Sequence, residues 1–401
     1  MYDAPAAMEP MLPGRDGDDG DLGDLALELV AESAQAAGRL HPLTEATLRA
    51  LLRTINSYYS NLIEGHRTHP IDIERAMRAD YAAAPARRAL QLESRAHIEV
   101  QQAIEARLAS EPDLATCDPG FLCWVHERFY GHLPPDFRLV QGPVGTAPET
   151  LVPGRLRERP VEVGRHLPPG AGALGRLLRR FAEVYAPERH RGQTRLIAAA
   201  ASHHRLAWIH PFLDGNGRVT RLFTDAYLGA IRIKGHGLWS ASRGLSRHRA
   251  EYLDHLAAAD GPRRGDYDGR GNLSLTGLTE FCRFFLQTCI DQARFMGRML
   301  ATDDLHQRIE GYVHLRAAGT LPGRPIKPVA APVLLTVFLR GALARGEAAA
   351  LTGYGERAGR DVIGGLLDEG LLVSDSPKGP VRSGLPMAAV PYLFPGVFPV
   401  D

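Results

Sequence analysis

WIHPFLDGNGRVTR, residues 208–221, joins two segments with helical periodicity. Pro211 disfavours a helical backbone at His210, so the first helix is expected to end there. After Gly217, apolar residues recur three and four positions apart, at Val219, Leu222, Phe223, Ala226, Tyr227 and Ala230. This spacing predicts that a second helix begins near Gly217. The Asp-Gly-Asn-Gly in the middle is therefore predicted to be a loop that opens onto a helix N-terminus.

The residues at this predicted helix start are suited to binding an anion. Gly215, Asn216 and Gly217 can bring backbone N–H groups close to a ligand, because the two glycines carry no Cβ. Arg218 and Arg221 lie three positions apart on the first turn, where both can approach the same anion.

Two further side chains in the loop suit chemistry on that anion. His210 can exchange a proton near neutral pH, and Asp214 offers an oxygen ligand for Mg²⁺. Together they predict a polyphosphate site with a general base beside it. A calcium loop is disfavoured because Arg218 and Val219 occupy its fifth and sixth positions, and no Walker A pattern is present. On local pattern alone, a plain loop with a capped histidine stays open.

The sequence HPFLDGNGRVTR matches every specified position of the HxFx[D/E]GN[G/K]RxxR signature of the Fic family. The helical pattern from about 95 to 260 is also similar to a Fic domain. This resemblance implies a mainly α fold, a Fic-type helical bundle with a β-hairpin flap. It also implies transfer of AMP from ATP to a hydroxyl side chain of a target protein, with Mg²⁺. Another nucleotide or a phosphocholine donor stays open, as does the choice among Ser, Thr and Tyr.

The resemblance implies a role for each residue of the loop. His210 deprotonates the target hydroxyl, Asp214 holds Mg²⁺, and Phe212 anchors the loop in the core. The phosphates lie against the start of the second helix, on Gly215, Asn216 and Gly217, with Arg218 neutralising the leaving pyrophosphate.

SNLIEG, residues 60–65, places Ser60 and Glu64 four positions apart at a predicted helix end, with Gly65 as the stop. An ordinary solvated helix terminus would explain these residues locally. The segment also resembles the [S/T]xxxE[G/N] inhibitory motif of Fic proteins. That resemblance implies that Glu64 pairs with Arg221 and occupies the space of the ATP γ-phosphate, so the protein is self-inhibited. Removal of AMP with the help of this glutamate stays open.

RERPVEVGRHLPP, residues 157–169, is predicted to form a hairpin or extended flap. Its position is similar to the target-docking flap of Fic proteins, which implies that Val161, Glu162, Val163 and Gly164 pair with an extended target segment. A purely structural hairpin is the alternative.

Tyr252 falls on a later predicted helix, where Fic relatives often line the nucleotide pocket. A core aromatic is the alternative reading of that position. His203 and His204 lack the partner spacing of a metal site.

The rest of the chain is divided by composition. Residues 1–22 are predicted to be a disordered acidic tail, because they combine Pro, Gly and Asp with few bulky apolar residues. Residues 23–110 are an N-terminal helical region with the inhibitory motif, 111–300 the Fic catalytic domain, and 301–328 a linker. Residues 329–401 show a helix, a helix–turn–helix and a hairpin, an order that resembles a winged helix.

The winged-helix resemblance raises a second class of function, a DNA-binding regulator with a secondary or inactive Fic core. The charged residues of the expected second helix sum to zero: Glu356, Arg357, Arg360, Asp361, Asp368 and Glu369. A DNA reader normally carries a basic stripe, so a protein-docking or dimerisation module is preferred.

Composition is consistent with an intracellular enzyme. The 47 basic and 46 acidic residues leave no bias toward nucleic acid or membrane. The four cysteines lack CxxC spacing and are expected to be reduced packing residues. No apolar run is long enough to cross a bilayer, and no signal peptide is evident, so a cytoplasmic location is expected. A homodimer is implied by the resemblance.

Overall fold

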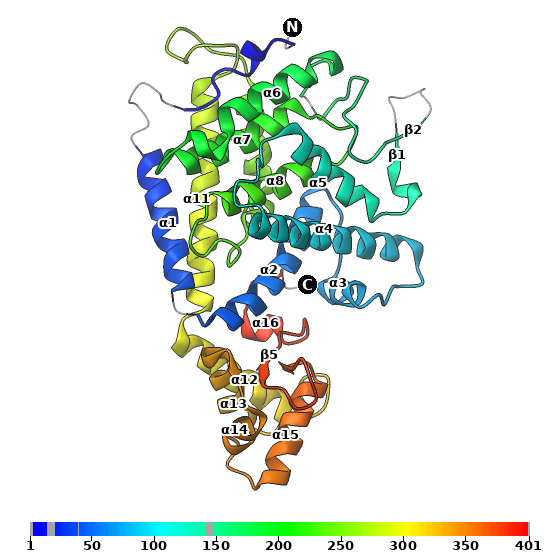
Figure 1. Cartoon of the computed structure of the whole chain (residues 1–401), viewed down its shortest axis with the longest axis vertical. Helices are drawn as coiled ribbons and strands as arrows, with labels where there is room; N and C mark the ends of the chain where they lie inside the picture. Colours follow the sequence, from blue (N-terminus) through cyan, green and yellow to red (C-terminus); the bar gives the residue numbers. More distant parts are fainter. Residues whose placement is uncertain (1–2, 14–20, 39, 142–147, 165, 400–401) are drawn as a thin grey trace.

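The computed structural model describes residues 3–13, 21–38, 40–141, 148–164 and 166–399. Helices dominate, and Figure 1 shows a large upper body above a smaller C-terminal lobe. The upper body contains α1 (Leu22–Ala37), α2 (Pro42–Ile63), α3 (Pro70–Met77), α4 (Pro85–Ser110), α5 (Pro119–Gly131), α6 (Leu174–Tyr185), α7 (Thr194–Ile209), α8 (Asn216–Ala230), α9 (Ala241–Arg247), α10 (Arg249–Asp260) and α11 (Leu275–Met299). Short 3-10 turns span Pro5–Met8, Pro135–Arg138, Ala171–Ala173 and Pro187–Arg189.

The helices α7 and α8 pack against each other and carry the predicted loop between them. The four consecutive alanines 198–201 of α7 are all buried, and their small side chains allow neighbouring helices to approach closely. α11 packs along α1, α7, α9 and α10, while α4 packs against α2, α5 and α8. Helices from the N-terminal region therefore complete the same core as the predicted catalytic domain. The mainly helical fold is confirmed.

In the part of the chain that the structure describes, five short strands form two sheets. The strands β1 (Leu139–Val140) and β2 (Glu149–Thr150) pair antiparallel, with Leu139 opposite Thr150. The strands β3 (Ala342–Leu343), β4 (Leu372–Val373) and β5 (Val381–Ser383) form an antiparallel sheet in the order β3-β5-β4. Among the described residues of 157–169, the strand pairing is an isolated bridge between Val163 and His166. The predicted flap is thus an extended loop closed by one bridge.

The C-terminal lobe contains α12 (Thr302–Ala317), α13 (Ala330–Arg340), α14 (Arg345–Ala350), α15 (Glu356–Asp368) and α16 (Val390–Leu393). Over 329–399 the lobe has α13, then α14 and α15 joined by a turn, then the paired strands β4 and β5, and the strand β3 between α13 and α14 was not predicted. The winged-helix classification stays a prediction. The linker predicted over 301–328 is wrong for its first half, which is α12. Its apolar residues have helical spacing and are buried, at Leu305, Ile309, Tyr312 and Val313.

The C-terminal segment returns to helix α2. Tyr59 donates a hydrogen bond to the carbonyl of Val397 (2.8 Å), and the ring of Phe398 lies 5.2 Å from that of Tyr58. Near the start of α2, Thr44 donates to the carbonyl of Phe338 (2.6 Å). The lobe is therefore packed directly against the helix that ends at the predicted inhibitory motif.

The disordered tail predicted over 1–22 is wrong for residues 3–13. Met8 is fully buried, and Met11 nearly so. The guanidinium of Arg205, itself fully buried, donates to the carbonyls of Met8 (3.0 Å) and Pro10 (2.7 Å). Composition did not reveal this order, because Ala7, Met8 and Met11 are buried in a core formed by helices that are distant in the sequence. Residues 14–20 lie outside the described residues.

Among the described helices, none combines the length and apolar character that crossing a bilayer requires. The four cysteines are free, and Cys117, Cys282 and Cys289 are buried, as expected for packing residues.

The packing of the N-terminal segment predicts that Met8→Ala lowers the free energy of unfolding by about 2–5 kcal/mol, as expected for truncation of a buried methionine. Chemical denaturation followed by circular dichroism measures this change. Met77→Ala is the matched control, because Met77 is 37% exposed and should change stability by less than about 0.5 kcal/mol. Equal, small effects would contradict the described packing.

The burial of His97 and His203 predicts that the protein loses stability in mild acid. Burial lowers the pKa of His97 and of His203 to about 3. Below the unfolded-state pKa of about 6.5 the unfolded chain binds the additional protons, so stability falls as pH falls from there toward 3. We expect these two histidines to lower the free energy of unfolding by about 2–3 kcal/mol between pH 7.5 and pH 5.5.

Denaturation at the two pH values measures the loss, and His203→Gln should reduce it by about 1.4 kcal/mol, the contribution of one buried histidine. His306→Gln is the control, since His306 lies at the surface with 47% of its side chain exposed. A pH dependence that His203→Gln leaves unchanged would contradict the assignment.

Candidate functional site

His210 lies at the end of α7 in a left-handed backbone conformation (φ 49°, ψ 62°). This conformation is uncommon for a residue with a Cβ, and it turns the chain sharply out of the helix. Arg157 supports the turn, because its Nε donates to the carbonyl of His210 at 2.7 Å. The imidazole Nδ1 lies 3.3 Å from the carbonyl of Ala207, and burial lowers the pKa of His210 to about 4. The neutral ring donates through Nδ1, which leaves Nε2 free to accept a proton.

The loop after His210 is held in shape by Asn216. Its Oδ1 accepts from the backbone N–H of Phe212 and its Nδ2 donates to the carbonyl of Phe212, both at 2.8 Å. The Phe212 ring is fully buried and stacks on His126 with ring centroids 4.1 Å apart. The side chain of Asn216 thus fixes the loop, and its backbone N–H is what the helix start can offer to an anion.

Asp214 and Gly215 contact Tyr130 of α5. The hydroxyl of Tyr130 donates to Asp214 Oδ2 at 2.7 Å. Gly215 has φ 78°, and a Cβ there would lie 2.7 Å from the Tyr130 ring, so a glycine is required. Burial raises the pKa of Asp214, but Arg218 and the Tyr130 hydroxyl outweigh it, so the pKa is lowered overall. Asp214 is therefore an ionised carboxylate with nearly half of its side chain exposed.

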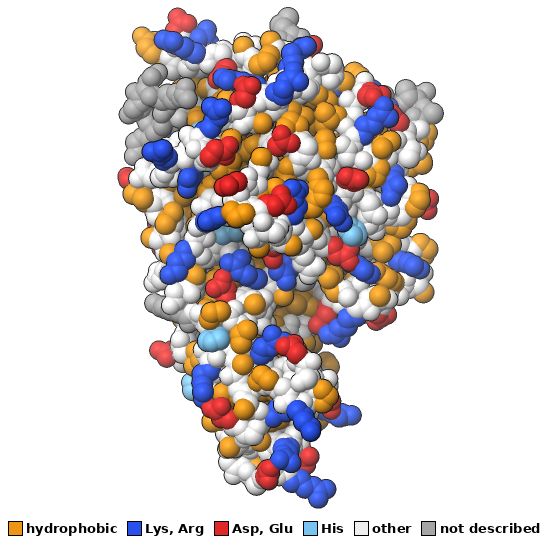
Figure 2. Space-filling view, in the orientation of Figure 1, with side chains coloured by type: hydrophobic (Ala, Val, Ile, Leu, Met, Phe, Trp, Pro, Cys, Tyr) orange, Lys and Arg blue, Asp and Glu red, His pale blue; other side chains and the backbone are white. Residues whose placement is uncertain are grey.

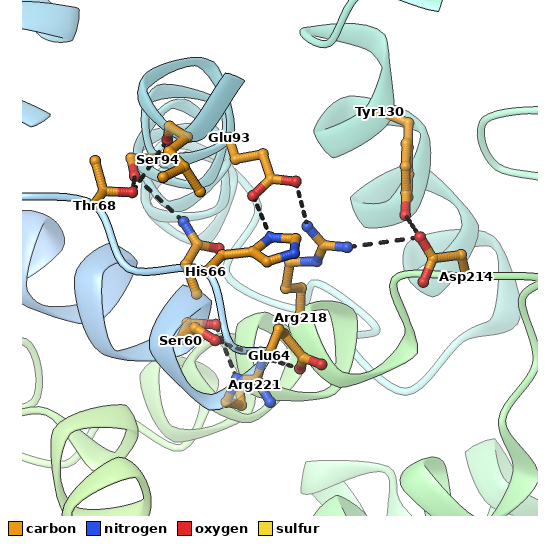
Figure 3. A network of polar contacts seen from close by, with 12 residues as sticks. Ser60, Glu64, His66, Thr68, Glu93, Ser94, Tyr130, Asp214, Arg218 and Arg221 are labelled. Carbon is orange, nitrogen blue, oxygen red and sulfur yellow. Dashed lines mark hydrogen bonds and ion pairs between the residues drawn. The ribbon is translucent and has the colours of Figure 1, made fainter. Parts of the chain in front are cut away.

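Arg221 is held by the two residues of SNLIEG that the inhibitory resemblance singles out (Figure 3). Its Nε donates to Ser60 Oγ at 2.8 Å and its Nη2 to Glu64 Oε1 at 2.5 Å. Burial raises the pKa of Glu64, but Arg221 more than offsets it and the carboxylate stays ionised. Gly65, which follows, has φ 86° and ends α2 as predicted.

The Glu64 carboxylate lies directly over the start of α8. A Cβ placed on Gly217 would collide with Glu64 Oε1. Gly217 is on the first turn of the helix, where N–H groups have no partner within the helix. The acidic side chain therefore occupies the position at which an anion would meet the helix N-terminus.

A second carboxylate, Glu93 of α4, contacts the other arginine. Arg218 Nη1 donates to Glu93 Oε1 at 3.2 Å, while Glu93 Oε2 lies 2.6 Å from His66 Nδ1. The Arg218 guanidinium lies over the ring of Phe129 (4.9 Å) and 3.7 Å from Asp214. Burial lowers the pKa of Arg218, but the surrounding acidic and phenolic groups raise it overall, so the arginine is charged.

The exposed residues of the flap, Glu162, Val163 and Gly164, follow a segment tied to the end of α7. Arg157 Nη2 donates to the carbonyl of Pro169 at 2.5 Å, and His166 Nε2 lies 2.8 Å from the carbonyl of Trp208. Val161 is half-buried. The flap is therefore held beside His210 with residues 162–164 exposed to solvent, and its role in docking stays a prediction.

Tyr252 is not brought to the loop surface. Its side chain is 3% exposed, and its hydroxyl lies 2.7 Å from His203 Nε2. His203 contacts Thr224 through Nδ1, and His204 contacts Asp260, so neither is arranged for a metal. Tyr252 occupies the buried position that was the alternative reading, because α11 and α7 enclose its ring, and its role in a nucleotide pocket stays a prediction.

Several residues that build the site were missed by the sequence reasoning. His126 and Tyr130 lie four apart on α5, and their polar atoms on a buried helix face were the available signal. Glu93 gave the same kind of signal, because it lies four positions before His97 and both residues are on the buried face of α4. Arg157 lies in a loop and carried no local signal.

The donor set at Asp214 fits magnesium held by one carboxylate together with phosphate oxygens. The carboxylate is ionised and partly exposed, as such binding requires. Within the described ranges no group of three or more His, Cys, Asp or Glu side chains is arranged to hold a metal by itself. Any ion here would thus depend on its ligand's oxygens.

Comparisons with known proteins agree with this geometry. The Fic/DOC family matches residues 117–228. Over 104 residues the chain is 36% identical to a Drosophila ananassae protein named protein adenylyltransferase Fic, covering 26% of this chain and 18% of the relative. A protein of the same name from Culex quinquefasciatus is 32% identical over 157 residues, covering 39% of this chain and 27% of the relative. The matches therefore span about a fifth to a quarter of these relatives.

Two solved structures share the fold. A Fic family protein from Desulfovibrio desulfuricans G20 has a TM-score of 0.51 at 19% identity, covering 90% of this chain and 95% of its own. A Fic domain containing signaling protein from Bacteroides thetaiotaomicron VPI-5482 has a TM-score of 0.52 at 18% identity, covering 68% and 96%. The loop at 210–221 lies inside the segment, residues 117–228, that matches the Fic/DOC family.

Proposed function

We propose that this protein is a protein adenylyltransferase that is inhibited by its own Glu64. In this reaction the hydroxyl oxygen of a target Ser, Thr or Tyr, on another protein or on this chain, attacks the α-phosphorus of ATP. The bond between that phosphorus and the bridging oxygen breaks, which gives protein-O-AMP and pyrophosphate. One observation carries the proposal: the Glu64 carboxylate lies on Arg221 and over Gly217, where a polyphosphate would bind.

His210 is the proposed base. Its Nδ1–H faces the Ala207 carbonyl, so Nε2 carries the lone pair that takes the hydroxyl proton. The low pKa, about 4, keeps the ring neutral throughout the physiological range. The left-handed turn and the Arg157 contact hold the imidazole in place before substrate binds.

The helix start and Arg218 are the proposed phosphate site. Transfer of a phosphoryl-type group depends mainly on positioning and on neutralising charge, and both the first turn of α8 and a buried guanidinium supply that. Asp214 is the proposed magnesium ligand. A bound magnesium ion would shield charge on the phosphate oxygens.

Glu64 inhibits the reaction through its charge and through the space that it occupies. A carboxylate beside Arg221 withdraws the positive charge that the terminal phosphate needs, and it repels that phosphate. Glu64 lies at the C-cap of α2, at the end of the helix, where a side chain can leave without unfolding the core. Removal of AMP with Glu64 orienting a water molecule stays a further proposal.

The flap supports a protein substrate. An exposed backbone edge beside His210 can pair with an extended target segment and direct its hydroxyl toward the base. The proposed edge consists of the backbone groups of Glu162 and Gly164, because those of Val163 are used in the bridge to His166. The half-buried Val161 lies next to it.

A DNA-binding role for the C-terminal lobe is not favoured. Basic and acidic side chains are intermixed over the lobe on the face drawn in Figure 2, and no broad basic stripe is visible there. The lobe is packed on α2 through Tyr59 and Thr44. We propose that it is a docking or dimerisation module, and that the protein acts in the cytoplasm.

Glu64→Gly is expected to raise AMP transfer at least about tenfold, because it removes the charge that occupies the phosphate site. Intact-protein mass spectrometry after incubation with ATP and Mg²⁺ measures the mass gain of one AMP. The double variant with His210→Ala should show no gain, since the base is missing.

Glu111→Gly is the matched control for that experiment. Glu111 is also a C-cap glutamate in an ion pair with an arginine, Arg107, but it lies at the end of α4 away from the loop. It should leave transfer at the wild-type level. No gain in Glu64→Gly, or a gain that survives His210→Ala, would overturn the proposed function.

A further inference from the structure

Arg218 is held by a carboxylate that does not belong to the predicted inhibitory motif. Glu93 is 6% exposed and accepts from Arg218 Nη1 at 3.2 Å. Its other oxygen lies 2.6 Å from His66, so both oxygens of the carboxylate have a partner. Figure 3 shows Glu93 on one side of Arg218 and Asp214 on the other.

The position of Glu93 in the fold distinguishes it from Glu64. Glu93 lies in the body of α4, which α2, α3, α5 and α8 cover. The backbone carbonyl of the next residue, Ser94, accepts a hydrogen bond from Ser57 of α2 at 2.9 Å. Glu93 therefore cannot leave the site as a helix-terminal side chain can, and it remains beside Arg218 when Glu64 moves.

Arg218 needs such a support to act on phosphate. Its guanidinium is long, flexible and 7% exposed, and its Nε has no hydrogen-bond partner. The contact with Phe129 holds the guanidinium over that ring, 4.9 Å from its centroid, but does not fix the directions of its N–H groups. The hydrogen bond at Nη1 removes this freedom and leaves the remaining N–H groups for a second anion.

We propose that Glu93 is a positioning residue for the AMP-transfer reaction, which holds the Arg218 guanidinium in the orientation that meets the phosphates. The inference rests on the proposed function. Glu93 lies outside both the loop 210–221 and the inhibitory motif 60–65. His66 shares the carboxylate from the opposite side, and the segment that carries Glu64 carries His66 as well.

The test is a steady-state comparison in the Glu64→Gly protein with ATP and Mg²⁺. Adding Glu93→Ala should lower kcat at least about tenfold, because a misplaced arginine loses its effect in the transition state. The KM for ATP should not rise, because removing a negative charge near a polyphosphate does not weaken its binding. Glu93→Gln keeps an acceptor oxygen for Arg218 and should lose less kcat than Glu93→Ala.

Glu99 provides a matched control on the same helix. It also bridges an arginine and a histidine, with Arg95 Nε at 2.7 Å and His132 Nδ1 at 2.9 Å, but away from the loop. Glu99→Gln should leave kcat within about twofold, as expected for a surface ion pair. Thermal unfolding of every variant checks folding, and Glu93→Gln decides the question if Glu93→Ala does not fold.

The outcomes separate the two proposals. A fall in kcat without a rise in KM, graded from Gln to Ala, supports the role of Glu93. An unchanged kcat, or a rise in kcat/KM that would make Glu93 a second inhibitor, overturns it. If the Glu64→Gly parent itself transfers no AMP, the proposed function fails, and the role of Glu93 in it fails too.

Discussion

The ion pair between Arg221 and Glu64 connects the end of α2 to the start of α8, and the arrangement of the site depends on it. Without an acidic partner, an arginine 5% exposed to solvent would carry a large desolvation cost. The pair offsets that cost inside the protein and places the carboxylate over Gly217, where no side chain stands in the way. The same contact therefore stabilises this arrangement and, in the proposed function, fills the anion site.

The charges at the site explain why a resting state of this kind is stable. Two arginines of α8 face three carboxylates, from Glu64, Glu93 and Asp214. Such a site does not attract a polyphosphate strongly until one carboxylate leaves or a cation joins it. Glu64, at a helix end, is the carboxylate that can leave. Glu93, in the middle of a helix, stays and orients its arginine.

Much of the site could be predicted from the sequence because its residues are adjacent in the chain. The loop 210–221 contains the turn, the helix start, the proposed base and both arginines, and Pro211 and the apolar spacing predicted the turn and the helix start correctly. The partner of Arg221 was available only through the family resemblance, since Glu64 is far away in the sequence.

The residues that could not be predicted are those whose role depends on distant packing. Glu93, Tyr130 and Arg157 reach the loop from three separate segments, and no local pattern indicates that contact. Tyr252 had an ambiguous spacing, and the helices around it place it in the core. The N-terminal residues 3–13 were predicted to be disordered because they contain few bulky apolar residues. They are ordered because helices far along the chain bury Met8.

The central claim is that Glu64 occupies the place of a phosphate. A crystal structure of the Glu64→Gly protein with Mg²⁺ and a non-hydrolysable ATP analogue tests it most directly. We expect the triphosphate over the start of α8, with its terminal phosphate beside Arg221 in the space that the carboxylate fills. An analogue bound elsewhere with that space empty, or bound in the wild-type protein while Glu64 still contacts Arg221, would contradict the account.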